Sequence, residues 1–578
     1  MIISLEVDMK RHKLFIFLLT LFTFLFLSQC KQQNLGTTLE KEIPRLMEKA
    51  DIPGLSMAVI QNGEIFWSGA FGVRSRETNE PVDENTIFEA ASLTKTITAV
   101  AALKLVEREE LDLDKPLAEY LPYPKLAGDE RYKKITARHI LTHTSGLPNW
   151  GDKLIREPGK LYGYSGEGFL YLGRTTEKIS GMSLEEFAKK EIFEPLGMSR
   201  TSYVWNDLYD ENGAAGHDRH GFANQKRRRT EPNGGASLLT TALDYATFLC
   251  SIMNDKVLEL KTIDLMLTPH VRATKRGDAQ DELDEYISWG FGWGIQPGNT
   301  ENGFWHWGDN GDLRAYTVSY PEEKAGLVFF ANSENLFLVA ESLISLVLDD
   351  PQHSFNWLTY KRLSDPEWTA YMTVEKTFLE EDEKAGLEKM AEMKNQFPDT
   401  FKTEDLNRIA RYLSGREKID EAEAIYKWII DSDPKSAIAW GGLGRLCLEA
   451  GRYKESLEYI QKTLELDPKH SLAKMSIPWV KEAIQAEENP VLVPEETLKK
   501  YAGDYGPRHV YFSQSRLCYK REGRKEYELV PLSQDTFALK GYGVFRLRFV
   551  LDKDGNATKV VGIYLGGRTD ESPRDKTT

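Results

Sequence analysis

Two pairs of apolar runs carry the alternating pattern of β-hairpins. LSMAVIQNGEIFWSGAFG (55–72) places one run on each side of Asn62-Gly63, and RAYTVSYPEEKAGLVFFAN (314–332) does the same around Pro321 to Lys324. Asn-Gly between such runs is typical of a two-residue hairpin turn. Helical spacing lies between the pairs, and a further helical run follows from Phe337 to Leu348. We therefore expect an α+β domain over about 36–350, with strands from both ends in one antiparallel sheet and helices packed on it.

From about 367 to 487 the pattern changes to helices alone, with a period of 34 residues. The matching positions are Trp440, Leu443, Gly444, Ser456, Ile460, Thr463 and Pro468 and, one period earlier, Leu406, Ile409, Ala410, Ala422, Tyr426, Ile429 and Pro434. This period, with small residues where two helices cross, predicts tetratricopeptide repeats. GLEKMAEMKNQFPDT (386–400) is similar to the second half of an earlier repeat. Two roles remain open for the repeats, a spacer or a binding surface for a protein or peptide partner.

From about 495 to 570 the pattern changes again, to short alternating strands. Phe545, Leu547, Phe549 and Leu551 fall on one face of a strand, with Arg546 and Arg548 on the other, before a turn at Asp554-Gly555. We expect a small all-β domain, in which no set of reactive side chains stands out.

The N-terminus has the pattern of a secretory signal. Lys10, Arg11 and Lys13 precede an apolar run from Leu14 to Leu27, which is shorter than the roughly 20 residues of a membrane span. Leu-Ser-Gln-Cys at 27–30 is similar to a bacterial lipobox, although Gln29 replaces the usual small residue. We expect a leader over 1–30, lipidation of Cys30, and an extracytoplasmic protein held by its lipid on the membrane, in the periplasm or at the outer membrane. A plain anchor helix is the alternative.

Composition narrows the choice of partners. The net charge of −15, from 74 basic and 89 acidic residues, argues against a nucleic-acid partner. The one basic run, residues 226–229, lies in a polar stretch and is interpreted as solvated surface. The four cysteines form no Cys-x-x-Cys pair and no cluster with zinc spacing, so we expect neither a disulfide framework nor a metal. No organic cofactor is implied.

EAASLTKTITAV (89–100) places Ser92 and Lys95 three residues apart at the start of a helical run. Residues at i and i+3 share a helix face, so the amine of Lys95 can return to the hydroxyl of Ser92. Ile97, Val100, Leu103 and Val106 predict a helix buried on one side. Burial and the helix dipole both lower a lysine pKa, and a neutral amine can accept the proton of a nucleophile. The spacing alone fits an ordinary helix start equally well.

Further motifs follow in a fixed order. They are LTHTSGLP (141–148), GYSGEGF (163–169), EPLGMSRTSY (194–203), GGASLLTTALDYATFL (234–249) and FWHWGDNGDLRAY (304–316). Together with Ser92-x-x-Lys95, this set resembles the serine β-lactamase and penicillin-recognising enzyme family. The resemblance covers about 36–350 and is strongest to the branch of class C β-lactamases, D-alanyl-D-alanine carboxypeptidases, D-aminopeptidases and related esterases. YAGDYG, YELVPL and TFALKG further along resemble a small β-domain often appended to secreted bacterial serine hydrolases.

The resemblance implies a role for each motif residue. Ser92 would be the acylated nucleophile, Lys95 its partner in proton transfer, and Tyr164 the relay, through a phenolate-like oxygen, to the leaving group. His306 with Gly308 would form the His-x-Gly version of the edge-strand motif. An oxyanion hole would come from the main-chain N–H groups of Ser92 and Asp309. His143 is interpreted as structural, and core positions are the alternative readings of Tyr164 and His306.

Two departures from the family pattern bear on the substrate. Tyr164-Ser165-Gly166 replaces Tyr-x-Asn, which removes a side-chain amide, and His306-Trp307-Gly308 lacks the lysine found in β-lactamases. Both favour a peptidase, amidase or esterase over an efficient β-lactamase. We expect Ser165, Gly308 and Arg314 to contact substrate, with Arg314 as a bidentate carboxylate donor or else a plain surface residue.

The prediction is therefore an extracytoplasmic serine hydrolase that acts through an acyl-Ser92 intermediate. Its substrate would be a small peptide, amide or ester, such as one derived from the cell wall. The rival hypothesis is a catalytically inactive penicillin-binding-like module that holds peptide or cell-wall fragments. Loss of the asparagine at position 166 supports the rival, and the joint presence of Ser92, Lys95, Tyr164 and His306 supports the enzyme.

Overall fold

The computed structural model describes residues 35–275, 282–521 and 525–575. The chain divides into two compact units, Met1–Ser364 and Asp365–Thr578. The predicted leader over 1–30, with Cys30, lies outside the described residues. In the ranges that are described, no helix combines the length and the apolar character needed to cross a membrane.

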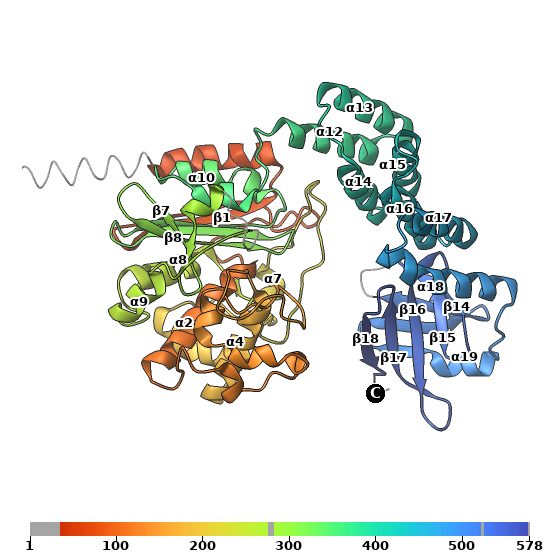
Figure 1. Ribbon diagram of the computed structural model, residues 1–578, viewed down its shortest axis with the longest axis horizontal. Helices are drawn as coiled ribbons and strands as arrows, with labels where there is room; N and C mark the ends of the chain where they lie inside the picture. The colour runs from red at the N-terminus through yellow and green to blue at the C-terminus, as the bar shows by residue number, and fades with distance from the viewer. Residues whose placement is uncertain (1–34, 276–281, 522–524, 576–578) are drawn as a thin grey trace, which may run out of the picture. The chain divides into compact units, whose positions relative to one another are not determined.

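An eight-stranded antiparallel sheet forms the middle of the first unit, in the order β2-β1-β10-β9-β8-β7-β6-β5 (Figure 1). The strands are β1 Gly54–Gln61, β2 Glu64–Gly72, β5 Val271–Arg272, β6 Ser288–Trp289, β7 Gly294–Pro297, β8 Asn302–Asp309, β9 Arg314–Tyr320 and β10 Ala325–Ala331. Strands from the N-terminal hairpin thus pair with strands from the C-terminal one, as predicted. Asn62 and Gly63 turn the first hairpin with φ of 54° and 74°, the left-handed conformation that a type I′ turn requires.

Helices cover both faces of this sheet (Figure 1). On one face, the helix over 35–50 and α10 (Ala340–Ser345) pack through Leu39 and Leu343. On the other face lie α2 (Thr94–Glu107), α4 (Gly166–Ser180) and α8 (Ala242–Met253). Alternate residues of β1 point to opposite faces of the sheet, since Val59 is buried in the core on one face and Ile60 in the core on the other. The α+β architecture is therefore confirmed.

Shorter elements are β3 Phe88–Glu89, β4 Leu239–Thr240, α3 Ala137–Leu141, α5 Leu184–Ala188, α6 Glu194–Leu196, α7 Leu208–Asn212, α9 Leu260–Leu267 and α11 His353–Leu358.

Helix α2 is buried on all sides, not on the single side that its apolar spacing predicted. Every residue from Thr94 to Leu103 is buried. The residues of α2 outside the predicted apolar face are mainly alanine and threonine, which are small enough for neighbouring segments to approach closely. The threonine hydroxyls are buried because they form hydrogen bonds inside the protein. Thr96 Oγ1 lies 2.7 Å from the Tyr245 hydroxyl, and Thr98 Oγ1 donates to the carbonyl oxygen of Gly234 at 2.8 Å.

The first unit continues past residue 350, where the sequence analysis places the end of its domain. Helix α11 follows that point, and its Phe355 and Trp357 are buried in the core on the same face as α10. Apolar side chains of α11 therefore complete this face of the sheet.

The second unit begins with paired helices. They are α12 Pro366–Glu380, α13 Glu383–Gln396, α14 Thr403–Gly415, α15 Ile419–Ser432, α16 Ala437–Glu449, α17 Tyr453–Leu466 and α18 Ser471–Glu488. Small residues sit at the helix crossings, as tetratricopeptide packing requires. A Cβ added at Gly442 would lie 2.2 Å from the Tyr426 ring, and one at Gly444 would lie 2.8 Å from Ile460. The earlier repeat, of which the sequence indicated only the second helix, has both helices, α12 and α13.

An antiparallel sheet of eight strands in sequential order ends the chain. Its strands are β11 Gly503–Tyr505, β12 Arg508–Ser513, β13 Arg516–Arg521, β14 Tyr527–Pro531, β15 Thr536–Leu539, β16 Tyr542–Leu551, β17 Ala557–Tyr564 and β18 Thr569–Pro573, preceded by α19 Glu495–Tyr501. The N–H of Asp575 donates to the carbonyl oxygen of Asp504 at 2.8 Å, which nearly closes the sheet into a barrel. Phe545, Leu547 and Phe549 are buried as predicted. Leu551 is exposed instead, because a register shift at Val550/Leu551 breaks the alternation.

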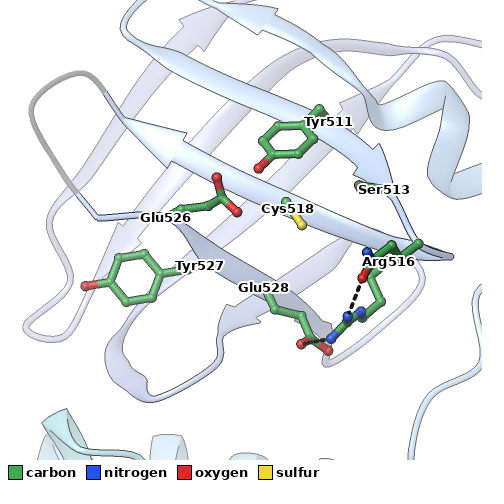
Figure 2. A pocket seen from close by; sticks show the side chains of 8 residues that line it. Tyr511, Ser513, Arg516, Cys518, Glu526, Tyr527 and Glu528 are labelled. Atoms are coloured by element: carbon green, nitrogen blue, oxygen red, sulfur yellow. Dashed lines mark hydrogen bonds and ion pairs between the residues drawn. The ribbon is translucent and has the colours of Figure 1, made fainter.

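A cavity of about 370 Å³ opens on this sheet, lined by Tyr511, Cys518 and Glu526 among others (Figure 2). Arg516 and Glu528 form an ion pair of 3.0 Å at its side. Burial, with Glu526 nearby, raises the pKa of the Cys518 thiol, which therefore stays protonated and unreactive at neutral pH.

Candidate active site

Ser92 stands in a short turn that leads directly into α2. The turn is a 3₁₀ segment, Ala91–Leu93, and Ala91 enters it with a left-handed φ of 47°. The Nζ of Lys95 lies 2.9 Å from Ser92 Oγ and donates to the carbonyl oxygen of Gly235 at 2.7 Å. The structure thus brings together the serine and lysine that the spacing predicted.

The amine of Lys95 is fully buried, and this decides its chemistry. Burial lowers the pKa of Lys95 to about 7. Both the neutral and the charged amine are therefore populated near neutral pH. A neutral amine can donate one hydrogen to the Gly235 carbonyl and accept the hydroxyl proton of Ser92 with its lone pair, which is the work of a general base.

Gly234 and Gly235 bring this carbonyl close to Lys95. An added Cβ at Gly234 would lie 2.6 Å from the carbonyl oxygen of Phe169, and one at Gly235 would lie 2.9 Å from that of Gly166. The glycine pair therefore fits tightly against α4, where a larger residue would have to shift. The Gly-Gly of the GGASLL motif was a visible sequence signal, although the contact it makes with Lys95 was not predicted.

Tyr164 lies directly before α4, beside the lysine. The Nζ of Lys95 is 4.8 Å from the centre of the Tyr164 ring. Burial raises the pKa of Tyr164, and interaction with the Ser92 side chain only partly opposes this, so the phenol is protonated at rest. Its hydroxyl is buried, and among the described residues no group meets ordinary hydrogen-bond geometry with it. The hydroxyl is therefore available to a substrate atom, as a neutral phenol and not as a resting phenolate.

His143 holds the chain on both sides of Tyr164. The N–H of Gly163 donates to the carbonyl oxygen of His143 at 2.7 Å, and the N–H of Ser165 donates to its Nδ1 at 3.1 Å. The rings of His143 and Tyr164 have their centres 4.4 Å apart. Burial, with Lys95 and His306 nearby, lowers the pKa of His143, so its ring is neutral. The geometry gives it the structural role expected from the sequence, and places that role at Tyr164.

His306 is buried on β8, with its ring centre 6.2 Å from that of Tyr164. Its Nδ1 lies 2.8 Å from the carbonyl oxygen of Trp307. A carbonyl can only accept, so Nδ1 carries the hydrogen and Nε2 carries the lone pair. Burial and the charge on Lys95 lower the pKa of His306 to about 3. His306 is thus a neutral acceptor, and it cannot replace the cationic lysine of β-lactamases.

Gly308 allows β8 to approach the residues before Ser92. An added Cβ there would lie 2.3 Å from the carbonyl oxygen of Ala90. The strand pairing with β7 runs only as far as Gly294 and Trp305, so His306–Asp309 extends past the end of β7, beside Ser92. This placement explains why the motif has a glycine at this position.

Two residues expected to contact substrate, Ser165 and Arg314, form hydrogen bonds within the protein instead. Ser165 is buried as the N-cap of α4, where its Oγ donates to Pro148 O at 2.8 Å and accepts from Gly168 N at 2.9 Å. Arg314 Nε pairs with Asp309 Oδ1 at 3.1 Å, and its Nη1 donates to the carbonyl oxygen of Glu334. Ser165 follows Tyr164 at the start of a helix, where a hydroxyl is favoured as a cap. Arg314 pairs with Asp309 because the two face each other across β8 and β9.

The basic run over 226–229 contains a structural residue that the sequence analysis missed. Arg227 donates through Nε to Glu89 at 3.0 Å and through Nη2 to Asp312, and both carboxylates are buried. Asn310 also donates to Glu89, at 2.6 Å. Arg227 therefore ties the turn after β8 to the segment just before Ser92, instead of standing in solvent. Its partners are 138 and 85 residues away, so no local pattern marked it.

Over the described parts of the chain, no three or more His, Cys, Asp or Glu side chains are grouped to hold a metal ion.

Comparison with known proteins gives two family matches. The Beta-lactamase family matches residues 39–347, which is more than half of the chain, and the tetratricopeptide repeat matches residues 407–471. The latter confirms the helical repeats.

Individual relatives are distant. Penicillin-binding protein 4* of Bacillus subtilis (strain 168) is 27% identical over 351 residues, 53% of this chain and 73% of its own length. Protein flp of Staphylococcus aureus (strain MRSA252) is 22% identical over 355 residues, 57% and 68% of the two chains. Among solved structures, D-alanine carboxypeptidase AmpC from Burkholderia cenocepacia is 21% identical, with a TM-score of 0.47, covering 54% of this chain and 99% of that one. A class C β-lactamase is 22% identical with the same score, covering 55% and 97%. By its match to the family over residues 39–347, the chain belongs to the Beta-lactamase family.

Proposed function

We propose that this protein is an extracytoplasmic serine hydrolase that forms an acyl-enzyme on Ser92 with a peptide, amide or ester. The observation that carries the proposal is the buried amine of Lys95, held between Ser92 Oγ at 2.9 Å and Gly235 O at 2.7 Å. Such an amine, with a pKa of about 7, is a competent base at neutral pH.

The reaction then has two halves. Ser92 Oγ attacks the carbonyl carbon while its proton passes to Lys95, and the main-chain N–H groups of Ser92 and Asp309 stabilise the oxyanion. The bond to the leaving group breaks as Tyr164 passes it a proton, which Lys95 restores. Water attacks the acyl-Ser92 ester in the second half, again losing its proton to the base, and releases the acid.

Peptide and ester substrates fit this site better than β-lactams do. His306 is neutral, so the motif offers no cation at the position of the β-lactamase lysine. Gly166 offers no side-chain amide. A relative named as a penicillin-binding protein supports a cell-wall-derived peptide as one candidate among these substrates. The leader pattern over 1–30, with its lipobox-like sequence before Cys30, supports a place outside the cytoplasm, and the tetratricopeptide repeats support a protein partner.

The second candidate is an inactive module that binds peptide or cell-wall fragments in the same cleft. It is favoured by one observation, the missing asparagine at position 166.

Intact mass of the full-length protein separates the two. We expect a fluorophosphonate to add one label to the wild type and none to Ser92→Ala. Treatment with a β-lactam should leave no lasting adduct. Turnover assays then exclude rapid β-lactam hydrolysis as the reason for the missing adduct. A stable β-lactam adduct on Ser92 would point to cell-wall peptides. An unlabelled wild type would overturn the enzyme proposal in favour of the inactive module.

A further inference from the structure

A cavity of about 440 Å³ is lined by Tyr164 and Trp307 among other residues. The loop before α4, strand β8 and the segment around α11 all contribute to it. Its aromatic walls are Tyr162, Tyr164, Trp307, Trp357 and Tyr360. The volume falls in the range of small-molecule sites, which is roughly 300–1,000 Å³. Tyr164 lines this cavity and also lies beside Lys95, whose Nζ is 4.8 Å from the centre of the Tyr164 ring, so the cavity adjoins the Ser92 site.

The aromatic walls are held in place by specific contacts. Trp357 Nε1 donates to Asp284 Oδ1 at 2.8 Å, and the Tyr360 hydroxyl donates to Asp309 Oδ2 at 2.6 Å. Trp307 packs on Tyr164, with ring centres 4.8 Å apart. Fixed side chains cost little to order when a ligand binds, so the cavity is preorganised.

The two charged side chains among the described lining residues are both cations. Arg156 lies among the lining residues and donates through Nη1 to the carbonyl oxygen of Tyr162 at 2.8 Å. Lys275 donates through Nζ to Thr359 Oγ1 at 2.8 Å and lies 5.6 Å from the centre of the Trp357 ring. No carboxylate side chain is among the described lining residues. Ile155, another lining residue, is 60% exposed, an apolar side chain open to a ligand.

We propose that this cavity is a leaving-group subsite for an aromatic or bulky apolar group that carries a carboxylate. Aromatic walls bury the ring, and the cations at Arg156 and Lys275 attract the anion. The assignment to the leaving group rests on the proposed function, in which Tyr164 passes a proton to the departing atom. Trp307 and Trp357 build the cavity, and Trp307 stands at the variable position of the His-x-Gly motif.

Three esters with one acyl group test this subsite on the full-length protein. The N-benzoylglycyl esters of phenyllactate, lactate and 1-phenyl-2-propanol form the same acyl-Ser92, so they share one deacylation rate and differ only in acylation. We expect kcat/KM for the phenyllactate ester to exceed that for the lactate ester at least about 10-fold, since burial of a phenyl group is worth that much. The ester without a carboxylate should be about 5-fold poorer than the phenyllactate ester, and Lys275→Gln should remove most of that difference.

A matched pair of variants locates the effect. Ile155→Asp places a carboxylate in the cavity, and should lower kcat/KM about 10-fold for the phenyllactate ester while fluorophosphonate labelling continues. Leu260→Asp changes a similarly exposed apolar residue on α9, at 56% exposure, and should change nothing. Equal kcat/KM for the phenyllactate and lactate esters would overturn the subsite.

Calorimetry tests the subsite independently of the proposed hydrolase activity. Free phenyllactate should bind Ser92→Ala at least about 10-fold more tightly than lactate does, because the ring enters the cavity whether or not Ser92 reacts. Equal binding of the two acids overturns the subsite even if Ser92 is labelled. Preferential binding in a protein that no reagent acylates supports the subsite and overturns only the hydrolase.

Discussion

The carbonyl oxygen of Gly235 accepts a hydrogen bond from the buried amine of Lys95 at 2.7 Å. The contact joins the start of α2 to a glycine pair 140 residues away, and it orients the amine that lies 2.9 Å from Ser92 Oγ. The geometry allows a neutral Lys95 to give one hydrogen to Gly235 while its lone pair faces Ser92.

The pH dependence of acylation should follow the titration of Lys95. Its pKa of about 7 makes the neutral base dominant above that pH and scarce below it. We expect the acylation rate with a small activated ester to rise about tenfold per pH unit below pH 6 and to level off above pH 8. Stopped-flow release of the leaving group measures it. A rate that is flat from pH 5 to pH 9 would exclude Lys95 as the base.

Stability should also depend on pH through Lys95, and it should rise with pH as the acylation rate does. The folded-state pKa, about 7, is below the ordinary value of 10.5, so the unfolded chain binds more protons between these limits, and stability rises with pH in that window. Lys95→Met removes this dependence. Its free energy of unfolding relative to the wild type should fall by roughly 3 kcal/mol from pH 6 to pH 9. Urea unfolding of both proteins at the two pH values measures this; a constant difference would contradict a depressed pKa.

Gly235→Ala should disturb the position of the Lys95 amine without changing the lysine itself. The added Cβ would meet the carbonyl oxygen of Gly166 at 2.9 Å, so the segment must move and its carbonyl must leave Lys95. We expect the acylation rate to fall at least about 10-fold, since a 1 Å misplacement is this costly. Gly128→Ala is the control, because an added Cβ there has nothing within 4 Å. Equal rates in the two variants would show that the Gly235 contact has no catalytic role.

His143 offers a test of how Tyr164 is held. His143 has a left-handed φ of 55°, a conformation that asparagine tolerates well. His143→Asn keeps an acceptor near the N–H of Ser165, whereas His143→Leu leaves that buried donor unpaired at a cost of about 1–3 kcal/mol. We expect His143→Leu to lower kcat about 10-fold or more with little change in KM, and His143→Asn to recover most of it. Equal loss of kcat in both variants would argue that the imidazole has another role.

Local patterns predicted more of this molecule than of its site. The Asn62-Gly63 hairpin and the 34-residue helical period depend on neighbours in sequence, and the structure has both. The same holds for Ser92 and Lys95, three residues apart on one helical turn. Ser165 and Arg314 were assigned to substrate from their place beside motifs, but a helix cap and a cross-strand ion pair occupy their polar atoms.

Distant contacts explain what the sequence could not reveal. Gly235 meets Lys95 across 140 residues, and Trp357, outside the expected 36–350 domain, closes a cavity against Tyr164. Such contacts follow from tertiary packing, which neither periodicity nor motif spacing records.

Arg227 should be the residue of the basic run that matters for folding. It pairs with Glu89 and Asp312, whose side chains are buried, so Arg227→Gln leaves two carboxylates without their cation. Because the arginine side chain is itself 33% exposed, we expect a loss of about 2–3 kcal/mol in the free energy of unfolding, below the value for a fully buried pair. Arg229→Gln, in the same run but with an exposed side chain, should stay within about 0.5 kcal/mol. Denaturant unfolding at pH 7 measures both. Equal stability of the two variants would show that Arg227 has no structural role and that the whole run is solvated surface.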